Sequence, residues 1–206
     1  MKSARENRAA TRWPFASITM VFMVLGRTLS IASEAPPEQA AALRALLSSL
    51  EIRDERLTPA QLEHVAVEVA AQPGLWRDLV VDSPDRRWWI VLHRTANYEV
   101  RLLSWEIDQT SDWHDHGGSS GGYLVVDGSL EERYRARAGA DLRERRLEAG
   151  ESGCFGPAHV HDMAHRSGRP AVSIHAYSPP LTGLTTYEET PYGLTTSGIR
   201  LDDDRD

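Results

Sequence analysis

The chain has 206 residues, with 23 Lys and Arg against 30 Asp and Glu, so its formal net charge is −7 when the histidines are neutral. This length predicts one domain with a sizeable core, and the acidic balance argues against a protein that binds nucleic acid through clustered positive charge. The single cysteine, Cys154, excludes an intrachain disulfide and a cysteine-based zinc cluster. A bound metal would therefore need histidine or carboxylate ligands.

The N-terminal residues have the order of a secretory signal: basic residues, then an apolar run of about a dozen residues, then small residues before Ser33. The apolar run is too short to span a bilayer. The alternative is that translation starts at Met20 or Met23, so that the upstream stretch was never selected to fold. In either case we treat residues 1–35 as an extension outside the folded domain, and we expect a cytoplasmic protein.

Two short helices are predicted ahead of everything else. A helical pattern opens at Ala35-Pro-Pro and places leucines near a 3.6-residue period up to Leu50. The second helix begins at Thr58, an N-cap residue that is followed by proline and, three positions after the cap, by Gln61. It ends at Pro73-Gly74.

From Arg87 onward the hydrophobic period changes to two, and short runs rich in Trp, Val, Ile and Tyr predict strands. Many short strands separated by turn signals are typical of a mainly β protein, either a sandwich or a small barrel. We expect the folded domain to cover residues 36–195 and residues 196–206 to form an acidic tail. The predicted strands are Trp88–Leu92, Tyr98–Trp105, Gly122–Val126, Glu131–Tyr134, Leu142–Arg146 and Ala171–Tyr177.

The sequence His114-Asp-His116 is the sharpest sign of a site, because residues i and i+2 of a strand point to the same face and their imidazoles can bind one ion. A third ligand would come from the segment that contains His159, His161 and His165. We choose His161 and assign the other two to the surroundings of the site or to the surface. Three neutral imidazoles would leave the full charge of a divalent ion on the metal, with open positions for substrate and dioxygen.

Ser173, His175 and Tyr177 alternate with apolar residues, so their polar groups share one face of a predicted strand. Inside a barrel these groups must be hydrogen-bonded to one another or to a bound molecule, which predicts a relay that ends at the tyrosine hydroxyl. The alternative is an amphipathic strand with its polar side in water. Arg94 can bind a carboxylate with two parallel hydrogen bonds, although a surface position is the default for one arginine among so many basic residues.

These features together resemble the cysteine dioxygenase family of thiol dioxygenases, which are small non-haem iron cupins. The resemblance extends over residues 38–190. It is carried by Ser104-Trp105 ahead of the histidine pair, by His161, and by the run Pro170-Ala-Val-Ser-Ile-His-Ala-Tyr-Ser-Pro-Pro180. The implied fold is a cupin-type small β-barrel, a jelly roll, with short N-terminal helices.

The resemblance also implies the chemistry. Fe(II) would be bound by His114, His116 and His161, and both atoms of O2 would be added to the thiol of L-cysteine to give cysteine sulfinic acid. Arg94 would hold the substrate carboxylate, and the relay would lie beside the bound thiol and dioxygen. The expected partners are therefore a small thiol and O2, with no nucleic acid and no membrane, and the expected state is a monomer.

The sequence departs from the family at several positions. Animal members place a cysteine, crosslinked to the tyrosine matched by Tyr177, where this chain has Gly121, so we expect no crosslink. We expect Cys154 to be an ordinary small buried residue. Leu92 replaces the aromatic residue that often precedes the substrate arginine by two, and the usual cupin glutamate after the histidine pair is missing. The missing glutamate favours a site of three histidines.

Three other functions remain open at this point. The substrate can be 3-mercaptopropionate or another small thiol, because relatives that act on it share the iron ligands. The same histidines can serve a Zn or Mn cupin isomerase or hydrolase, which would need a general base beyond the relay. The third alternative is a non-catalytic cupin that binds a small ligand or senses metal.

Overall fold

The computed structural model describes residues 34–201. The signal-like segment and the last residues of the predicted acidic tail, 202–206, lie outside the described residues. Ala35, one residue before the predicted domain boundary, donates a hydrogen bond from its N–H to the Val91 carbonyl at 2.8 Å. Within this part, no helix is long and apolar enough to span a membrane.

Two helices precede the strands, as predicted: α1, Pro37–Ser49, and α2, Pro59–Ala70. At the start of α2 the Thr58 side chain accepts a hydrogen bond from the Gln61 N–H, and the Gln61 side chain accepts one from the Thr58 N–H. This reciprocal pair confirms the capping box that the sequence predicts. Two short 3-10 helices follow, η1, Pro73–Leu75, and η2, Arg77–Leu79.

Ten strands follow these helices in the described residues, and the fold is therefore mainly β, as predicted. Six of them correspond to the predicted strands, with small differences at their ends. Four were not predicted: β6, β7, β9 and β10. The strands are β1, Trp88–Arg94; β2, Glu99–Trp105; β3, Ser120–Asp127; β4, Ser129–Arg135; β5, Arg143–Glu148; β6, Ser152–Phe155; β7, Val160–Ala164; β8, Ala171–Ser178; β9, Gly183–Thr190; and β10, Gly193–Leu201. Because β10 continues to Leu201, the strand includes residues that we assigned to the tail.

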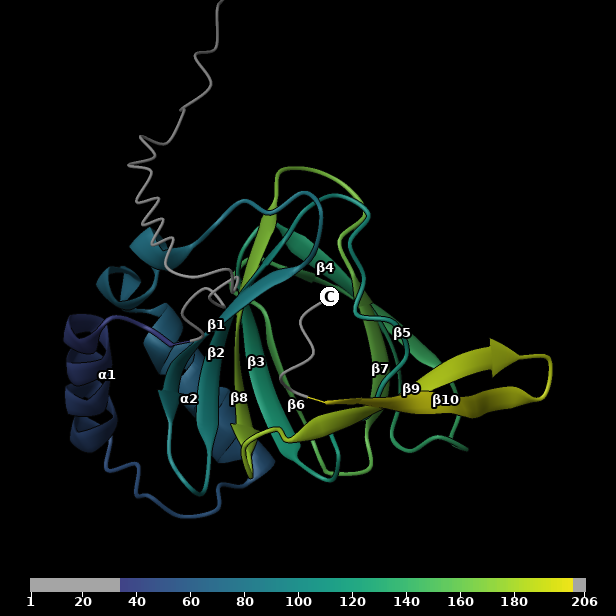
Figure 1. Cartoon of the computed structure of the whole chain (residues 1–206), viewed down its shortest axis with the longest axis horizontal. Coiled ribbons are helices and arrows are strands. Elements are labelled where there is room, and N and C mark those ends of the chain that lie inside the picture. Colours follow the sequence, from purple (N-terminus) through teal and green to yellow (C-terminus); the bar gives the residue numbers. More distant parts are fainter. Residues whose placement is uncertain (1–33, 202–206) are drawn as a thin grey trace, which may run out of the picture. The chain divides into compact units, whose positions relative to one another are not determined.

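The strands form a barrel of the cupin type (Figure 1). One wall is a five-stranded sheet in the order β1-β2-β8-β3-β6, and the other contains the sheet β5-β4-β7 and the hairpin β9-β10. The segment around His114 links these last two, because His114 pairs with His161 of β7 on one side and with Thr186 of β9 on the other. The segment that carries the histidine pair is thus built into the wall of the barrel.

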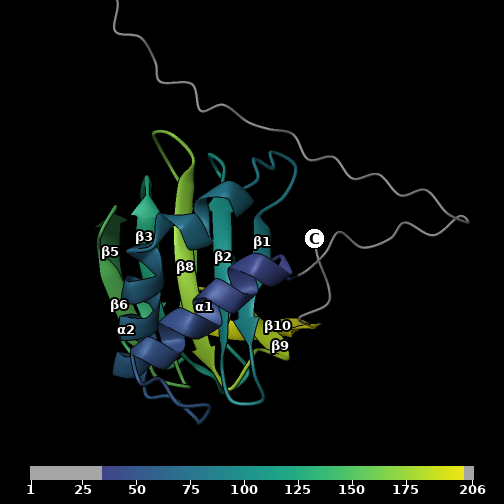
Figure 2. The ribbon, with the colours of Figure 1, turned by 90° about the vertical axis from the view of Figure 1, so that its left-hand side faces the viewer.

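The five-stranded sheet is buried on both faces. Its outer face is covered by α1 and α2 (Figure 2), where Leu62 and Val65 pack with Ile174. Each side chain of this kind contributes roughly 1.5–3 kcal/mol when it is fully buried. The contact is close: a Cβ at Gly122 would lie 2.1 Å from the backbone nitrogen of Glu63 in α2. The inner face of the sheet is therefore the one left to line a site.

Candidate metal centre

His114 and His116 lie in the segment between β2 and β3, and our expectation of a regular strand there is wrong. A single bridge holds the segment in an extended conformation at His114, whose N–H donates to the His161 carbonyl at 2.9 Å and whose carbonyl accepts from the His161 N–H at 3.0 Å. The two histidines nevertheless reach the same interior space. One bridged residue is enough to orient this short pair.

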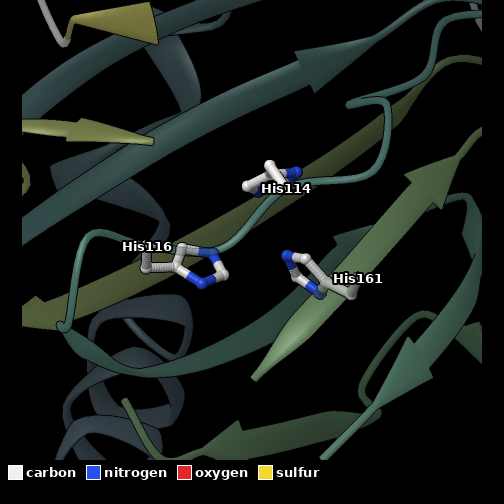
Figure 3. A group of neighbouring side chains, drawn as sticks. All are labelled: His114, His116 and His161. Carbon is white, nitrogen blue, oxygen red and sulfur yellow. The ribbon is translucent and has the colours of Figure 1, made fainter. Parts of the chain in front are cut away.

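His114, His116 and His161 point toward one another in the barrel interior (Figure 3). One ring nitrogen from each histidine lies within 4.8 Å of the ring nitrogens of the other two. All three side chains are buried, at 6%, 1% and 2% exposure respectively. Three imidazoles that converge in this way can bind one divalent transition-metal ion. His159 and His165 do not belong to this group.

The hydrogen bonding of the three rings fits a metal. Among residues 34–201, neither ring nitrogen of His116 has a hydrogen-bond partner, although the side chain is buried. His114 Nδ1 lies 2.8 Å from the Asp112 carbonyl oxygen, and His161 Nδ1 lies 2.7 Å from Glu132 Oε1, so Nε2 of both rings remains to bind an ion. Buried polar atoms without partners are costly, and a bound metal would satisfy them.

The electrostatics of the site also suit metal binding. Burial, followed by the neighbouring histidines, lowers the pKa of His116 well below its usual range, and burial together with His161 does the same for the pKa of His114. Both rings are therefore neutral near pH 7. A neutral imidazole can bind a metal without first losing a proton.

Glu132 on β4 is a buried carboxylate that sequence reasoning missed. Its Oε1 accepts from His161 Nδ1, while its Oε2 accepts from the Tyr123 hydroxyl and from Arg145 Nε, both at 2.6 Å. Although burial raises the pKa of Glu132, hydrogen bonds from His159 and His161 hold it well below its usual range. The ionised carboxylate requires a hydrogen on His161 Nδ1, which directs the Nε2 lone pair to the metal position.

Glu132, His159 and His161 form a second group that could in principle hold an ion. This group shares His161 with the first, and the Glu132 oxygens already accept hydrogen bonds from Tyr123 and Arg145. Glu132 therefore acts as a hydrogen-bond partner of His161 in the three-histidine site, and we do not assign it as a ligand of a second ion. The alternative of a surface position is wrong for both other histidines, since His159 is 6% exposed and His165, with Nδ1 2.9 Å from the Ser129 carbonyl, is fully buried.

Ser173, His175 and Tyr177 lie along β8 and are all buried, so the alternative of a polar face in water is wrong. His175 Nε2 lies 2.9 Å from Ser173 Oγ, and His175 Nδ1 lies 3.2 Å from the Tyr177 hydroxyl. Trp105 extends the chain, because its Nε1–H donates to Ser173 Oγ at 2.9 Å. At the other end, the Tyr177 ring stacks on His116 with 5.4 Å between ring centres. The relay thus reaches the histidine triad.

Arg94 lies at the end of β1, with its side chain 38% exposed. Its Nε lies 2.7 Å from Glu99 Oε2, and its Nη2 donates to the Leu181 carbonyl at 3.0 Å. Glu99 is directly opposite both Arg94 and Tyr177 in the sheet, so all three side chains belong to the inner face. Arg94 is therefore at the edge of the same inner surface that carries the relay.

Arg101 is a second arginine on this surface, and sequence reasoning missed it. Its side chain is 7% exposed, its Nη2 lies 2.6 Å from Glu99 Oε1, and its guanidinium carbon lies 5.9 Å from the centre of the Tyr177 ring. It is paired with His175 across β2 and β8. Two arginines thus contact one carboxylate beside the relay.

The space above Gly121 is filled by an aromatic ring. A Cβ at Gly121 would lie 2.2 Å from Cζ of Phe155, and the Phe155 ring stacks on His116 with 4.5 Å between ring centres. Phe155 thus occupies the position that a larger residue at 121 would need.

The neighbouring Cys154 is exposed, so our expectation of a buried cysteine is wrong. Successive side chains of a strand point to opposite faces, so the Cys154 side chain points outward because its neighbour on β6, Phe155, points inward.

Comparison with solved structures finds proteins that are similar over about half of this chain. They include TT1209 from Thermus thermophilus, with a TM-score of 0.45 and 19% identity over 50% of this chain and 93% of that chain. A protein with a double-stranded β-helix domain from Klebsiella pneumoniae has a TM-score of 0.42 and 20% identity, over 50% and 85%. KdgF from Halomonas sp. has a TM-score of 0.41 and 17% identity, over 48% and 84%.

A family comparison covers much more of the sequence. The family described as cysteine dioxygenase type I matches residues 30–190. This range includes the three histidines, the relay on β8 and both inner-face arginines, and it agrees with the extent of the resemblance found from the motifs alone. The chain therefore belongs to the cysteine dioxygenase type I family.

Proposed function

We propose that this protein is an Fe(II)-dependent dioxygenase that adds both atoms of O2 to the thiol of L-cysteine and so forms cysteine sulfinic acid. The observation that carries the proposal is the buried triad of His114, His116 and His161, with the Tyr177 ring stacked directly on one of its members. Membership of the cysteine dioxygenase type I family supports it.

His114, His116 and His161 would hold the metal through one ring nitrogen each. Bound Fe(II) would supply a redox-active Lewis acid that lowers the pKa of a thiol and accepts dioxygen. The protein supplies no carboxylate ligand within the triad, and Glu132 instead acts through His161. This ligand set favours binding of an anionic substrate.

The inner-face arginines are suited to the other end of the substrate. A guanidinium can form two parallel hydrogen bonds with a carboxylate, and we assign this role to Arg94, with Arg101 contributing positive charge from the buried side. Glu99 holds both guanidinium groups in place and accepts a hydrogen bond from the Leu181 N–H at 3.2 Å. Substrates without a carboxylate would lose this contact.

Ser173, His175 and Tyr177 would bind and orient the reacting groups. The Tyr177 hydroxyl ends the relay next to the triad and can hydrogen-bond to the bound thiol or to oxygen. The reaction is balanced without another reductant, because the electrons that dioxygen takes up come from the sulfur of the substrate. Two S–O bonds form as the O–O bond breaks, and the thiol proton remains with the sulfinic acid or passes to water.

The proposal includes a cytoplasmic location, because the reaction needs reduced iron and free cysteine, and it keeps a monomer as the default state. The substrate 3-mercaptopropionate is the second candidate, since it has the same thiol and carboxylate and lacks only the amine. The experiment is to load the purified protein with Fe(II) without oxygen, to admit O2 with each thiol, and to compare oxygen consumption with the product by mass spectrometry. Cysteine sulfinic acid in preference to the other product supports the proposal, and no oxygen uptake by the iron-loaded protein contradicts it.

A further inference from the structure

Trp105 lies at one end of the relay, where it can donate a hydrogen bond but cannot accept one. Its Nε1–H donates to Ser173 Oγ at 2.9 Å, and the same oxygen lies 2.9 Å from His175 Nε2. An indole N–H donates and has no lone pair to accept with, whereas a hydroxyl and a neutral imidazole can each do both. The first hydrogen bond of the chain therefore has a fixed direction.

The fixed Trp105 donor also determines the direction of the next hydrogen bond, between Ser173 and His175. Its side chain is fully buried, so its own hydroxyl hydrogen needs an acceptor inside the protein. In the part of the chain that the structure describes, Ser173 Oγ has two hydrogen-bond neighbours, Trp105 and His175, and of these only the imidazole can accept. The Ser173 hydroxyl therefore donates to His175 Nε2.

The direction then determines which nitrogen of His175 carries its hydrogen. Burial lowers the pKa of His175 to about 3, so the ring is neutral near pH 7 and has one N–H. Because Nε2 accepts, the hydrogen lies on Nδ1, which is 3.2 Å from the Tyr177 hydroxyl oxygen. Nδ1–H donates to that oxygen, and the hydroxyl hydrogen of Tyr177 is left to point away from His175.

We propose that Trp105 is a positioning residue that sets the direction of the whole relay, so that the Tyr177 hydroxyl accepts a hydrogen bond from His175 and directs its own hydrogen to a group other than His175. If the relay ran the other way, the Tyr177 hydroxyl would donate to His175 and could only accept from a bound molecule. The direction follows from the hydrogen bonds alone. Its use, to donate to a thiolate sulfur or a reduced oxygen, rests on the proposed function.

The test is the tautomer of His175, read from its ring nitrogens by long-range proton–nitrogen correlation in isotope-labelled, full-length protein. The spectrum is recorded on the metal-free protein and on the protein loaded with diamagnetic Zn(II), and a His175→Gln variant assigns the signals. We expect Nδ1 to carry the hydrogen and Nε2 to have the shift of an acceptor. A hydrogen on Nε2 in the wild-type protein overturns the proposal.

Two variants test the role of Trp105 itself. Trp105→Phe keeps an aromatic ring beneath Arg87, whose guanidinium carbon lies 4.8 Å from the Trp105 ring centre, and removes only the donor. Ser173→Ala removes the intermediate hydroxyl and keeps the test possible if the first variant does not fold. In both, we expect a measurable population of the other His175 tautomer.

Trp76→Phe is the matched control. Trp76 is also a buried indole that donates a hydrogen bond, to the Ala70 carbonyl at 3.3 Å, but it packs in the core between the helices and the sheet. We expect the wild-type tautomer in this control. The wild-type tautomer in Trp105→Phe would show that something else sets the direction. Because the spectra require no turnover, failure of the proposed function would appear separately, as no thiol oxidation by the Fe(II)-loaded wild-type protein.

Discussion

Replacement of Glu132 by glutamine tests whether this carboxylate orients a metal ligand. Glu132 is fully buried and accepts hydrogen bonds from His161, Tyr123 and Arg145. An amide is neutral, so even where its one oxygen accepts from His161 it holds that hydrogen more weakly than a carboxylate does, and its NH2 group cannot accept from Arg145. We expect metal affinity to fall about 10- to 100-fold, which corresponds to about 1.4–2.8 kcal/mol. We expect the metal-free protein to lose about 2–4 kcal/mol of unfolding free energy, because a partly buried guanidinium loses its partner.

The assay is a competition titration of Zn(II), and of Fe(II) without oxygen, against a chromophoric chelator, together with urea unfolding of the metal-free protein. Glu131→Gln is the control: Glu131 is the neighbouring residue on β4, its side chain is 47% exposed, and its ion pair with Arg146 is at the surface. It should leave both quantities near their wild-type values. Wild-type metal affinity in Glu132→Gln, even with lower stability, would refute the argument that Glu132 orients His161.

Three further results are expected. Tyr177→Phe should lower kcat for thiol oxidation about 100-fold or more while iron content stays at the wild-type level, and unchanged turnover would remove the hydroxyl from the reaction. Arg94→Ala and Arg101→Met should raise KM for L-cysteine about tenfold or more and change KM for cysteamine, which has no carboxylate, much less; equal effects on the two thiols would place both arginines outside the substrate site. Burial lowers the pKa of His175 to about 3 against about 6.5 in the unfolded chain, so its contribution to stability is fully present above about pH 6.5 and is lost as the pH falls toward 3. Urea unfolding of the metal-free protein should show a loss of about 1 kcal/mol from His175 between about pH 6.5 and 5.5, and His175→Gln should remove that part of the pH dependence.

The features that could be predicted from the sequence are those with a local pattern. Ser173, His175 and Tyr177 alternate with apolar residues on one strand, and the histidine pair at His114 and His116 is close in sequence, so each group is brought together by backbone geometry alone. The N-cap at Thr58 is local in the same sense. Such features need no knowledge of which strands are neighbours.

The unpredicted strands lack that pattern. β7, Val160–Ala164, is buried at every position although it contains polar residues, so it has no alternation to detect. The hairpin β9-β10 consists largely of half-buried and exposed residues rich in threonine and glutamate. Its place in the barrel depends on contacts with distant segments, such as the bridge between His114 and Thr186.

The unpredicted site residues depend on the order of strands in the sheets. Arg101 and Glu99 become part of the inner surface because β2 lies beside β8, and Glu132 reaches His161 because β4 lies beside β7. A charged residue in a strand is most often at the surface, and only the sheet order reverses that expectation. Long-range pairing of this kind leaves no signal in a single sequence.

The most direct test of the central claim is one turnover with isotopically heavy dioxygen. Protein loaded with Fe(II) and L-cysteine without oxygen is mixed with the labelled gas, and the product is weighed by mass spectrometry; a His161→Ala protein, treated in the same way, is the control for iron that is not held by the triad. The account predicts cysteine sulfinic acid with both of its new oxygen atoms labelled, and none from the control. A product with label in only one oxygen, or cystine with no labelled oxygen, would contradict it.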